Sequence, residues 1–545
     1  MLVKPPRGFR GVFRTDDDAR AVYSEAAGIG RALGLAVAVP VDADDVALIM
    51  RWASEAGLPL IPRGSGSSMP GGAIGIGIVL DLSRLRELSD PDLAGRCIRA
   101  EVGVLRGEVD RRARSADLRF PVDPSSGEFC TVGGMTATNA AGPHSLRHGP
   151  MRPWVLAIDC VFEDGTLATI RRGEPPPTEV AAIRRFMQNA HPTLLDWARD
   201  GHSGVLKDSS GYAIDAYAQT HDLIDLLVGS EGTLAVFTSV ELALIPVAGA
   251  SASLFVSFSD LEQAVDAAVA AREHGAAACE LLDRTFLTLA AKSGQPLPVS
   301  TGAEAALLID VESENASSAM EMVDRLRSLF RSRGGGPAGG RADDAIVASG
   351  PGREAELWSF RHAASPAIAR IDPSLRSMQF IEDSAVPPTA LAAYVRGVRA
   401  ILERAETGGV IFGHAGDAHV HVNPLLDVGR SDWRTRVERI LGEVTELVAT
   451  LRGTLTGEHG DGRLRTPLLD RVWSRDALER FALIKRSFDP ANILNPGVKV
   501  ALPDQKAIDV VKYDPTLDPL PPAAHRALSV VERDRAYSRF RLDLL

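Results

Sequence analysis

The chain has 545 residues, of which 60 are Lys or Arg and 71 are Asp or Glu, for a net charge of −11. With 45% hydrophobic and 24% charged residues, its composition is that of a globular protein of two or three domains, which excludes a disordered or fibrous chain. The acidic balance, without any run of Lys or Arg, argues against a nucleic-acid-binding protein.

Local sequence excludes further classes. No apolar stretch reaches the roughly 18–20 residues that cross a bilayer, and the N-terminus lacks the apolar core of a signal peptide. We therefore expect a cytoplasmic protein that reaches a membrane surface only through a partner. The cysteines form no Cys-x-x-Cys pair, which argues against a disulfide framework and against an iron–sulfur cluster in this chain. They are Cys97, Cys130, Cys160 and Cys279.

The first half of the chain has the pattern of an α/β unit followed by β-rich structure. The predicted elements are a helix near 18–33, a strand over 37–40, a helix over 42–57 and strands over 58–62, 78–82, 155–161, 168–170 and 232–244. The runs at 155–161 and 168–170 flank an Asp-Gly turn, which is typical of a hairpin. A domain boundary is predicted after Pro246.

The second half predicts helices beside antiparallel strands, which is typical of an α+β domain. The predicted elements are strands over 255–257, 306–311 and 410–423, and helices over 261–274, 318–333, 434–451 and 475–488. Thr454–His459 has a further strand-like pattern. After residue 500 a Pro-rich stretch and a charged end predict a tail or an interaction arm.

Residues 61–72 read IPRGSGSSMPGG directly after a predicted strand. Gly and Ser at these positions let several backbone N–H groups converge on one anion, and pyrophosphate suits such a loop. A tight structural connection is the alternative. Neither a Gly-Lys-Ser/Thr P-loop nor a GxGxxG fingerprint is present, which disfavours an NAD-dependent dehydrogenase.

Two other segments are rich in Gly, hydroxyl and amide groups. Residues 121–149 read PVDPSSGEFCTVGGMTATNAAGPHSLRHG, and residues 229–234 read GSEGTL. Such a composition does not favour a packed core, but it supplies many hydrogen-bond donors for a large polar ligand.

Four of the 12 histidines lie between residues 414 and 459: His414, His419, His421 and His459. If residues 410–423 form one strand, His419, His421 and Asn423 share a face. Imidazoles with a neighbouring carboxylate suit Zn²⁺, Fe²⁺ or Mn²⁺. Hydrogen-bonded strand histidines are an equally weighted alternative.

Seven motifs, read in order, resemble the FAD-linked oxidases of the vanillyl-alcohol-oxidase superfamily. They are PRGSGSSMPGG, DPSSG…TVGGMTATNAAGP…RHG, GYAIDA, VGSEGTLAVFT, GHAGDAHVHVN, LTGEHGDG and SFDPANILNPGVKV. The resemblance spans residues 15–500 and is greatest for the subfamily of glycolate oxidase flavoprotein subunits, D-lactate dehydrogenases and D-2-hydroxyglutarate dehydrogenases.

This resemblance implies an α+β fold with four parts: an N-terminal lead-in (1–34), a PCMH-type FAD-binding domain of two α+β subdomains (35–247), a cap domain with an antiparallel sheet and flanking helices (248–500), and a tail (501–545). It implies non-covalent FAD, because no His lies in the first Gly-rich loop. The implied cofactor-binding residues are Pro62, Arg63, Gly64, Ser65, Gly66, Ser67, Ser68, Pro124, Ser125, Thr131, Gly133, Gly134, Thr138, Asn139, Gly142, Glu231, Gly232, Val236 and Asn495.

The resemblance also implies roles in catalysis. His414, His421 and Glu458 match the ligands of a divalent metal, with Zn²⁺ favoured over Fe²⁺ or Mn²⁺. His459 matches the catalytic base, Asn423 an active-site amide and Arg361 the cation that binds the substrate carboxylate. The family more often has Asn where His419 stands, so His419 is left as an extra ligand, a substrate contact or a supporting residue.

The implied reaction is oxidation of a D-2-hydroxy acid. D-2-hydroxyglutarate dehydrogenases place a Lys where Ile381 stands, which favours a small or apolar substrate such as glycolate or D-lactate, although Arg376 could compensate. The alternatives are a D-2-hydroxyglutarate dehydrogenase, an alkylglycerone-phosphate-synthase-like transferase and a non-catalytic subunit. The expected electron acceptor is a separate iron–sulfur protein, docked through the tail, or a quinone, and a homo-oligomer stays open.

Overall fold

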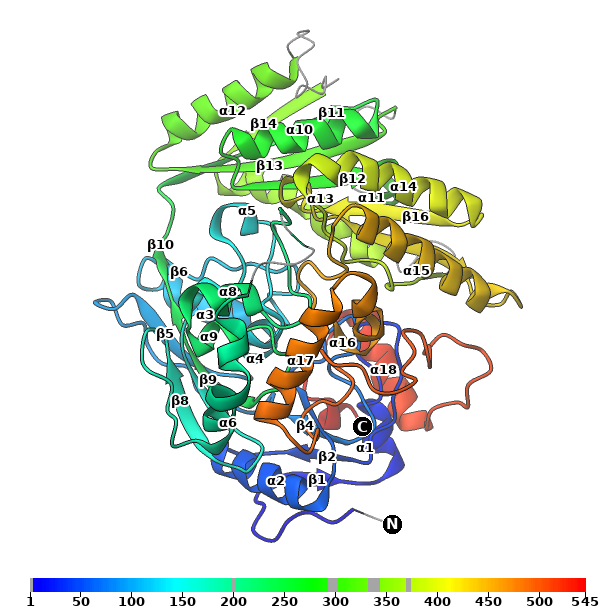
Figure 1. Ribbon diagram of the computed structural model, residues 1–545. Helices are drawn as coiled ribbons and strands as arrows, with labels where there is room; N and C mark the ends of the chain where they lie inside the picture. The colour runs from blue at the N-terminus through cyan, green and yellow to red at the C-terminus, as the bar shows by residue number, and fades with distance from the viewer. Residues whose placement is uncertain (1–2, 198–201, 203, 293–301, 332–343, 369–373) are drawn as a thin grey trace.

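The computed structural model describes residues 3–197, 202, 204–292, 302–331, 344–368 and 374–545. Two bodies of mixed helix and sheet make up the chain (Figure 1). The N-terminal domain, from β1 to β9, forms the lower body in blue to green. The cap domain, from β11 to β17, forms the upper body in green to yellow, and the last segment returns to the lower body.

The first sheet has the strand order β1-β2-β4-β3. The strands span Val12–Arg14, Ala36–Val39, Ile78–Asp81 and Leu60–Arg63, in that order. β2 and β3 both run parallel to β4, and α2 (Ala43–Ala56) connects β2 to β3. The Asp42 carboxylate caps the start of α2, and Gly57 ends the helix with a φ of 62°. The predicted strand–helix–strand unit is confirmed.

The second sheet is antiparallel, with the order β5-β9-β7-β8. The strands span Cys97–Glu101, Val236–Ala243, Val155–Val161 and Leu167–Arg171. The predicted hairpin is β7–β8. Five helices share the apolar core of this sheet. They are α3, α4, α6, α8 and α9, which span Arg106–Arg114, Val132–Thr138, Ala181–Asn189, Ile214–Thr220 and Leu223–Leu227.

The cap domain contains a seven-stranded antiparallel sheet in the order β14-β11-β13-β12-β16-β17-β15. The strands span Asp344–Ser349, Ala250–Phe258, Ala305–Ser313, Ala278–Asp283, Gly408–Gly413, His421–Asp427 and Leu375–Ser377. Because successive side chains of a strand point to opposite faces, Leu254 and Phe255 of β11 lie in different apolar clusters. Both faces of the cap sheet are therefore covered. The α+β fold with an antiparallel cap is confirmed.

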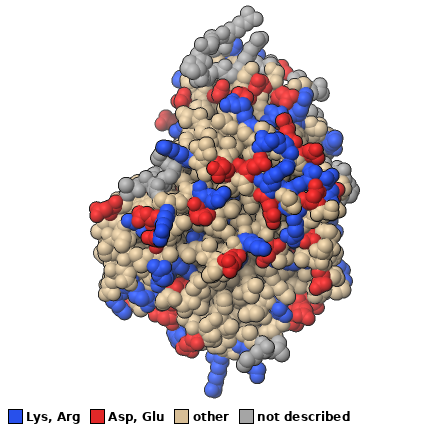
Figure 2. Space-filling model, turned by 45° about the vertical axis from the view of Figure 1, so that its right-hand side comes forward, with Lys and Arg blue, Asp and Glu red and all other residues tan. Residues whose placement is uncertain are grey.

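The helices of the cap domain divide between the two apolar clusters. α10, α12, α14 and α15 pack on one face, whereas α11 and α13 pack on the other. These helices span Leu261–Glu273, Ala316–Arg331, Leu391–Arg404, Trp433–Thr450, Arg284–Lys292 and Pro351–Ile368. Basic and acidic side chains are interspersed over this domain in the view of Figure 2. Surface ion pairs such as Arg404–Glu443 and Arg396–Glu262 account for part of this mixing.

Three predicted elements differ from the structure. The helix near 18–33 is only α1, Asp17–Val22, and Gly28 beyond it packs so closely on the Met69 carbonyl that a side chain there would have no room. Residues 410–423 are the ends of β16 and β17 around a 3-10 turn at Ala415–Asp417, so His419 lies outside the strand that carries His421. Thr454–His459 is irregular, with a single bridge to Ala385.

The chain returns to the N-terminal domain after the cap. α17 (Arg475–Phe488) places Phe481, Ile484 and Phe488 in the N-terminal core. α18 (Pro522–Asp534) packs on α1. Among the helices that the structure describes, none combines the length and the apolar content needed to cross a bilayer.

Candidate active site

One cavity of about 1020 Å³ runs between the two domains. It lies at the upper end of the roughly 300–1,000 Å³ range of small-molecule sites. Its wall includes Arg361, His421, Asn423, Glu458 and His459. It also includes most residues predicted to bind the cofactor: Pro62, Arg63, Gly64, Ser65, Gly66, Ser67, Ser68, Pro124, Ser125, Thr131, Gly133, Gly134, Thr138, Glu231, Gly232 and Val236.

The loop after β3 fits the phosphates of a dinucleotide. A Cβ atom on Gly64 would overlap the Thr131 hydroxyl, and Gly66 has a φ of 76°, so both positions need glycine. The Ser68 hydroxyl lies buried in the cavity wall without a hydrogen-bond partner in the described chain. These glycines and the unsatisfied hydroxyl match an anionic cofactor that approaches the backbone closely.

Four predicted cofactor residues support the loops with their polar groups. Asn139 ends α4 in the left-handed region (φ 52°) and accepts a hydrogen bond from the Arg152 backbone. The Gly142 carbonyl accepts from Ser145, whereas the Asn495 amide donates to the Gly72 and Glu231 carbonyls. The Arg63 guanidinium donates to the carbonyls of Tyr23, Glu25 and Ala73, which fixes the loop from behind.

Glu231 connects this cofactor site to the segment that carries His459. Its carboxylate accepts hydrogen bonds from the backbone N–H groups of Asp461 (2.6 Å) and Gly462 (3.0 Å). Lys499 Nζ lies 3.1 Å from the same carboxylate and 2.9 Å from Asp461. We call residues 457–462 the base loop. The N-terminal domain therefore holds one side of this loop.

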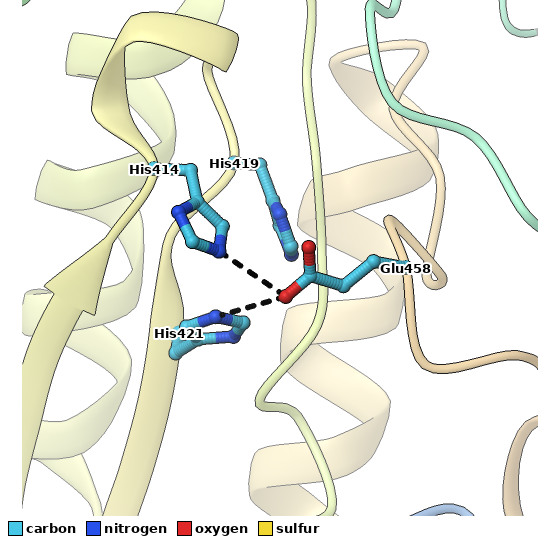
Figure 3. A group of neighbouring side chains, drawn as sticks. All are labelled: His414, His419, His421 and Glu458. Atoms are coloured by element: carbon cyan, nitrogen blue, oxygen red, sulfur yellow. Dashed lines mark hydrogen bonds and ion pairs between the residues drawn. The ribbon is translucent and has the colours of Figure 1, made fainter. Parts of the chain in front are cut away.

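His414 and His421 turn their Nε2 atoms toward one oxygen of Glu458, at 3.2 and 3.5 Å (Figure 3). The opposite ring nitrogens are already engaged. His414 Nδ1 lies 2.5 Å from Glu280, and His421 Nδ1 donates to the Glu382 carbonyl at 2.8 Å. These contacts place the proton on Nδ1 and leave Nε2 as the free donor atom, which is how metal-binding histidines are oriented. The donor set fits a divalent metal.

Sequence reasoning missed Glu280, which lies fully buried on β12 outside any motif. Its carboxylate also accepts from Arg361 Nε at 2.6 Å. Although burial disfavours the charged ring, the Glu280 charge raises the pKa of His414 to about 9. If a divalent cation bound at Nε2, it would replace that proton, because metal binding displaces protons from its ligands.

His459 lines the cavity with a side chain that is 28% exposed. Its Nδ1 lies 3.1 Å from Glu382, and its Nε2 lies 3.6 Å from Glu458. Burial disfavours the imidazolium, but the charges of Asp383 and Glu382 raise the pKa of His459 to about 9. The contact at Nδ1 orients the ring so that Nε2 faces the cavity and the predicted metal ligands.

Asp383 holds the cap side of the base loop. Its carboxylate accepts from the backbone N–H of His459 at 2.9 Å and from Arg465 at 3.0 Å. His419 Nε2 lies 3.0 Å from the same carboxylate, and burial lowers the pKa of His419 to about 3. A neutral His419 therefore donates to Asp383, although its ring also lies near the metal-binding group. The sequence shows Glu382 and Asp383 as an acidic pair but not this role.

Lys207 is a second residue that sequence reasoning missed. It is fully buried, and its Nζ lies 3.0 Å from Glu458 Oε2 and 3.5 Å from Asp417. Because Lys207 occupies Oε2, the other oxygen of Glu458 is the one that faces the histidines. Its own flanking sequence carries no recognisable signal.

The cavity wall near Arg361 does not include Ile381, the position that sequence analysis linked to the choice of substrate. Ile381 packs in the apolar cluster of the cap domain and is not among the residues that line the cavity. Arg376, Ser377 and Gln379 line it instead. Ile381 therefore does not contact the cavity, whereas Arg376 supplies a cation to its wall. Arg361 itself is buried and lies 4.9 Å from the centre of the Phe412 ring.

Known proteins resemble the chain along nearly its whole length. Residues 34–171 match the model of an FAD binding domain, and residues 248–498 match the model of the FAD linked oxidases, C-terminal domain. The D-lactate dehydrogenase of Archaeoglobus fulgidus is 30% identical over 467 residues, which cover 85% of this chain and 90% of the relative. The chain belongs to the FAD-linked oxidase family. It is thus an FAD-dependent oxidoreductase.

A further relative and two solved structures also resemble the chain. Glycolate oxidase subunit GlcD of Bacillus subtilis is 28% identical over 509 residues, covering 91% of this chain and 95% of the relative. The structure of 4-ethylphenol oxidase from Gulosibacter chungangensis superposes with a TM-score of 0.65 at 15% identity, over 90% of this chain and 94% of that chain. An alkyldihydroxyacetonephosphate synthase superposes with a TM-score of 0.60 at 14% identity, over 89% of this chain and 82% of that chain. At these identities the two structures establish the shared fold alone.

Proposed function

We propose that the protein oxidises the 2-hydroxyl group of a D-2-hydroxy acid to a 2-oxo group, with FAD and a divalent metal. The observation that carries this proposal is that His459, His421 and Glu458 line the cofactor cavity together, with His414 directly behind them against Glu458. Arg361 lines the same cavity and offers a cation for the substrate carboxylate.

The reaction removes a proton and a hydride from one carbinol. When bound, the flavin supplies the hydride acceptor and the divalent cation supplies a Lewis acid. With its ring neutral, His459 takes the hydroxyl proton at Nε2, because Nδ1 is engaged by Glu382. Arg361 binds the carboxylate, and the Asn423 amide, whose oxygen has no partner in the described chain, orients the hydroxyl group.

We further propose that the metal is held by His414, His421 and Glu458, with Zn²⁺ favoured and Fe²⁺ or Mn²⁺ as alternatives. FAD is held without a covalent bond, since residues 64–68 contain no His. The reduced flavin passes its electrons to a separate acceptor, an iron–sulfur protein or a quinone. Arg376 in the cavity wall supports a dicarboxylate such as D-2-hydroxyglutarate as a second candidate substrate.

Anaerobic bleaching of the flavin tests the proposal. The metal-loaded protein is mixed with glycolate, D-lactate, L-lactate, D-2-hydroxybutyrate and D-2-hydroxyglutarate, and the flavin absorbance is followed in a stopped-flow instrument. We expect one D-acid to bleach the flavin at least tenfold faster than its L-form. If FAD is bound and no acid on the panel bleaches it, the proposal is wrong.

Two variants test the assigned roles. His459→Gln should slow bleaching by about 10²–10⁴-fold while FAD stays bound, as expected for loss of a general base. Arg361→Gln should mainly raise the substrate concentration needed for half-maximal rate. His274→Gln, an exposed histidine at the end of α10, is the matched control and should bleach like the wild type.

A further inference from the structure

The matched family domains end at residue 498, yet the chain beyond them forms part of the cofactor cavity. We call residues 513–541 the C-terminal strap. Helix α18 forms its middle part and ends at Arg535, which has a φ of 50°. The chain then turns back, so that Tyr537 lies close to the helix end. The residues of the strap that line the cavity are Tyr513, Ser529, Glu532, Arg533, Asp534, Arg535 and Tyr537.

The strap is anchored on the N-terminal domain. Ala524 and Ala527 of α18 are buried in one apolar cluster with Val22 of α1. Beyond the helix, the Phe540 ring lies 3.9 Å below the Arg84 guanidinium. A segment fixed on both sides of its turn has little freedom, and its contacts with the cavity therefore belong to the folded protein.

The strap joins both cofactor loops. Arg541 donates to the Ser65 carbonyl at 3.2 Å, within the loop that fits the phosphates. The Tyr537 ring lies 5.4 Å from the Phe129 ring, in the second Gly-rich segment, and the Arg535 guanidinium lies 4.9 Å from that same ring. The two loops thus meet on one element that comes from the far end of the sequence.

The strap also reaches the cap domain. The Tyr513 hydroxyl donates to Glu532 at 3.0 Å, and the Arg376 guanidinium of β15 lies 6.0 Å from the Tyr513 ring. Arg376 lines the cavity beside Ser377 and Gln379. The strap therefore extends from the phosphate loop to the wall that the cap domain contributes, along the length of the cavity.

Positive charge collects where the strap meets the phosphate loop. Arg541 and Arg63 are both buried, and the Nε atom of each has no partner in the described chain. Burial and the neighbouring Arg63 charge lower the pKa of Arg541 to about 10, which leaves Arg541 charged at neutral pH, and an arginine such as Arg63 keeps its proton in proteins. Two buried cations behind one Gly-rich loop favour an anion in front of it.

We propose that the C-terminal strap retains FAD in the cavity: Tyr537 forms part of the wall against the cofactor, and Arg541 holds the phosphate loop through Ser65. Removal of the Tyr537 side chain opens the cavity on this side, and removal of the Arg541 side chain releases the Ser65 carbonyl of the phosphate loop. The inference rests on the FAD site of the family and not on the identity of the substrate.

Release of FAD from the full-length holoenzyme tests the proposal. The rate is read from the rise in flavin fluorescence after dilution, without substrate or metal. Tyr537→Ala should release FAD at least about tenfold faster, because an aromatic ring contributes a large contact area. Tyr537→Phe should release it like the wild type. Arg541→Met should release it at least about tenfold faster, since the loop loses a charged hydrogen bond.

Arg539→Ala is the matched control, because Arg539 lies on the same turn with an exposed side chain. It should release FAD within about twofold of the wild-type rate, as expected for a surface substitution. Wild-type release from both Tyr537→Ala and Arg541→Met would overturn the proposal, and it is the result expected if the strap served only to dock a partner.

A second measurement covers variants that fail to fold. Hydrogen exchange of the wild-type protein is compared with and without bound FAD. The backbone amides of residues 529–541 should exchange at least about tenfold more slowly when FAD is bound. Equal exchange in the two forms would contradict the retaining role, whatever the substrate of the enzyme is.

Discussion

Glu280 holds two functional side chains at once, because its oxygens contact His414 at 2.5 Å and Arg361 at 2.6 Å. Glu280→Gln keeps the shape but removes the charge, and its amide nitrogen cannot accept a hydrogen bond from either partner. Loss of such a supporting carboxylate typically lowers metal affinity by about 10–100-fold. We expect that loss for Zn²⁺, measured by competition with a chromophoric chelator.

The control for Glu280 is Glu354→Gln. Glu354 is also a buried carboxylate of the cap domain, but it bonds to Ser251 rather than to a histidine. It should bind Zn²⁺ with wild-type affinity. Unchanged affinity in Glu280→Gln would mean that the orientation of His414 does not depend on Glu280.

His419→Asn tests which of the four clustered histidines are ligands. Because His419 Nε2 donates to Asp383, an Asn amide can supply a similar donor without removing a ligand. We expect the metal content per chain, measured by mass spectrometry, to equal that of the wild type. A folded variant that loses the metal would instead make His419 a ligand.

For single residues, the sequence predicts the site residues that lie in motifs, but it misses the buried residues that hold them in place. His414, His421 and Glu458 stand out because imidazoles and a carboxylate occur close together in the chain, and the structure brings them together. Glu280 and Lys207 come from segments without a motif. Their roles depend on burial and on distant partners: His414 lies 134 positions from Glu280, and Glu458 lies 251 positions from Lys207.

The phosphate loop depends on close contact between two elements, the end of β3 and the start of α4. Gly64→Ala would place a methyl group against the Thr131 hydroxyl, which caps α4 by accepting from the Gly134 N–H at 3.3 Å. We expect the variant to be purified with little or no FAD, measured as the ratio of flavin to protein absorbance. Its secondary structure should be unchanged, because the rest of the domain does not depend on this contact.

Gly442→Ala is the matched control for Gly64→Ala. Gly442 lies in α15, and nothing stands within 4 Å of the position of an added Cβ atom. It should keep a full complement of FAD and gain up to about 1 kcal/mol of stability, since Ala favours a helix. Full FAD in Gly64→Ala would show that the loop can shift away from α4 without loss of the site.

Regular elements are the part of the fold that the sequence predicts best. The helices expected over 261–274 and 475–488 are α10 and α17, because their apolar periodicity is local. The strand pattern at 454–459 is misleading, since Asp383 and Glu231 hold that segment in an irregular path. Neither contact can be read from residues near 454.

The two domains also meet at a buried ion cluster away from the cavity. Glu312 of β13 bonds to Arg119 of the N-terminal domain at 2.7 Å and lies 3.1 Å from His148. Burial alone would raise the pKa of Glu312, but hydrogen bonds from His148 and Arg119 hold it well below its usual value. Because the folded pKa is depressed, this carboxylate stabilises the fold above the unfolded pKa of about 4.3 and loses that effect as the pH falls.

Glu312→Gln should therefore be less stable than the wild type at pH 7 by about 3 kcal/mol, as for a broken buried ion pair. The difference should shrink by roughly 1.4 kcal/mol per pH unit below about pH 4.3. Urea unfolding at pH 7 and pH 3 measures both values. A difference in stability that does not change with pH would mean that the pKa of Glu312 is the same in the folded and the unfolded chain.

The way in which both domains hold the base loop determines where the sequences of two relatives can be joined in a chimaera. The cap domain holds it through Asp383, whereas Glu231 and Lys499 hold it from the other side. A chimaera that exchanges only the part of the cap from β11 to β15, with crossovers near residues 248 and 380, keeps His459 and all three anchors from one parent. A crossover between Asp383 and His459 separates the base from one anchor. The wall that carries Arg361 and Arg376 can thus be exchanged while the proposed base keeps all its anchors.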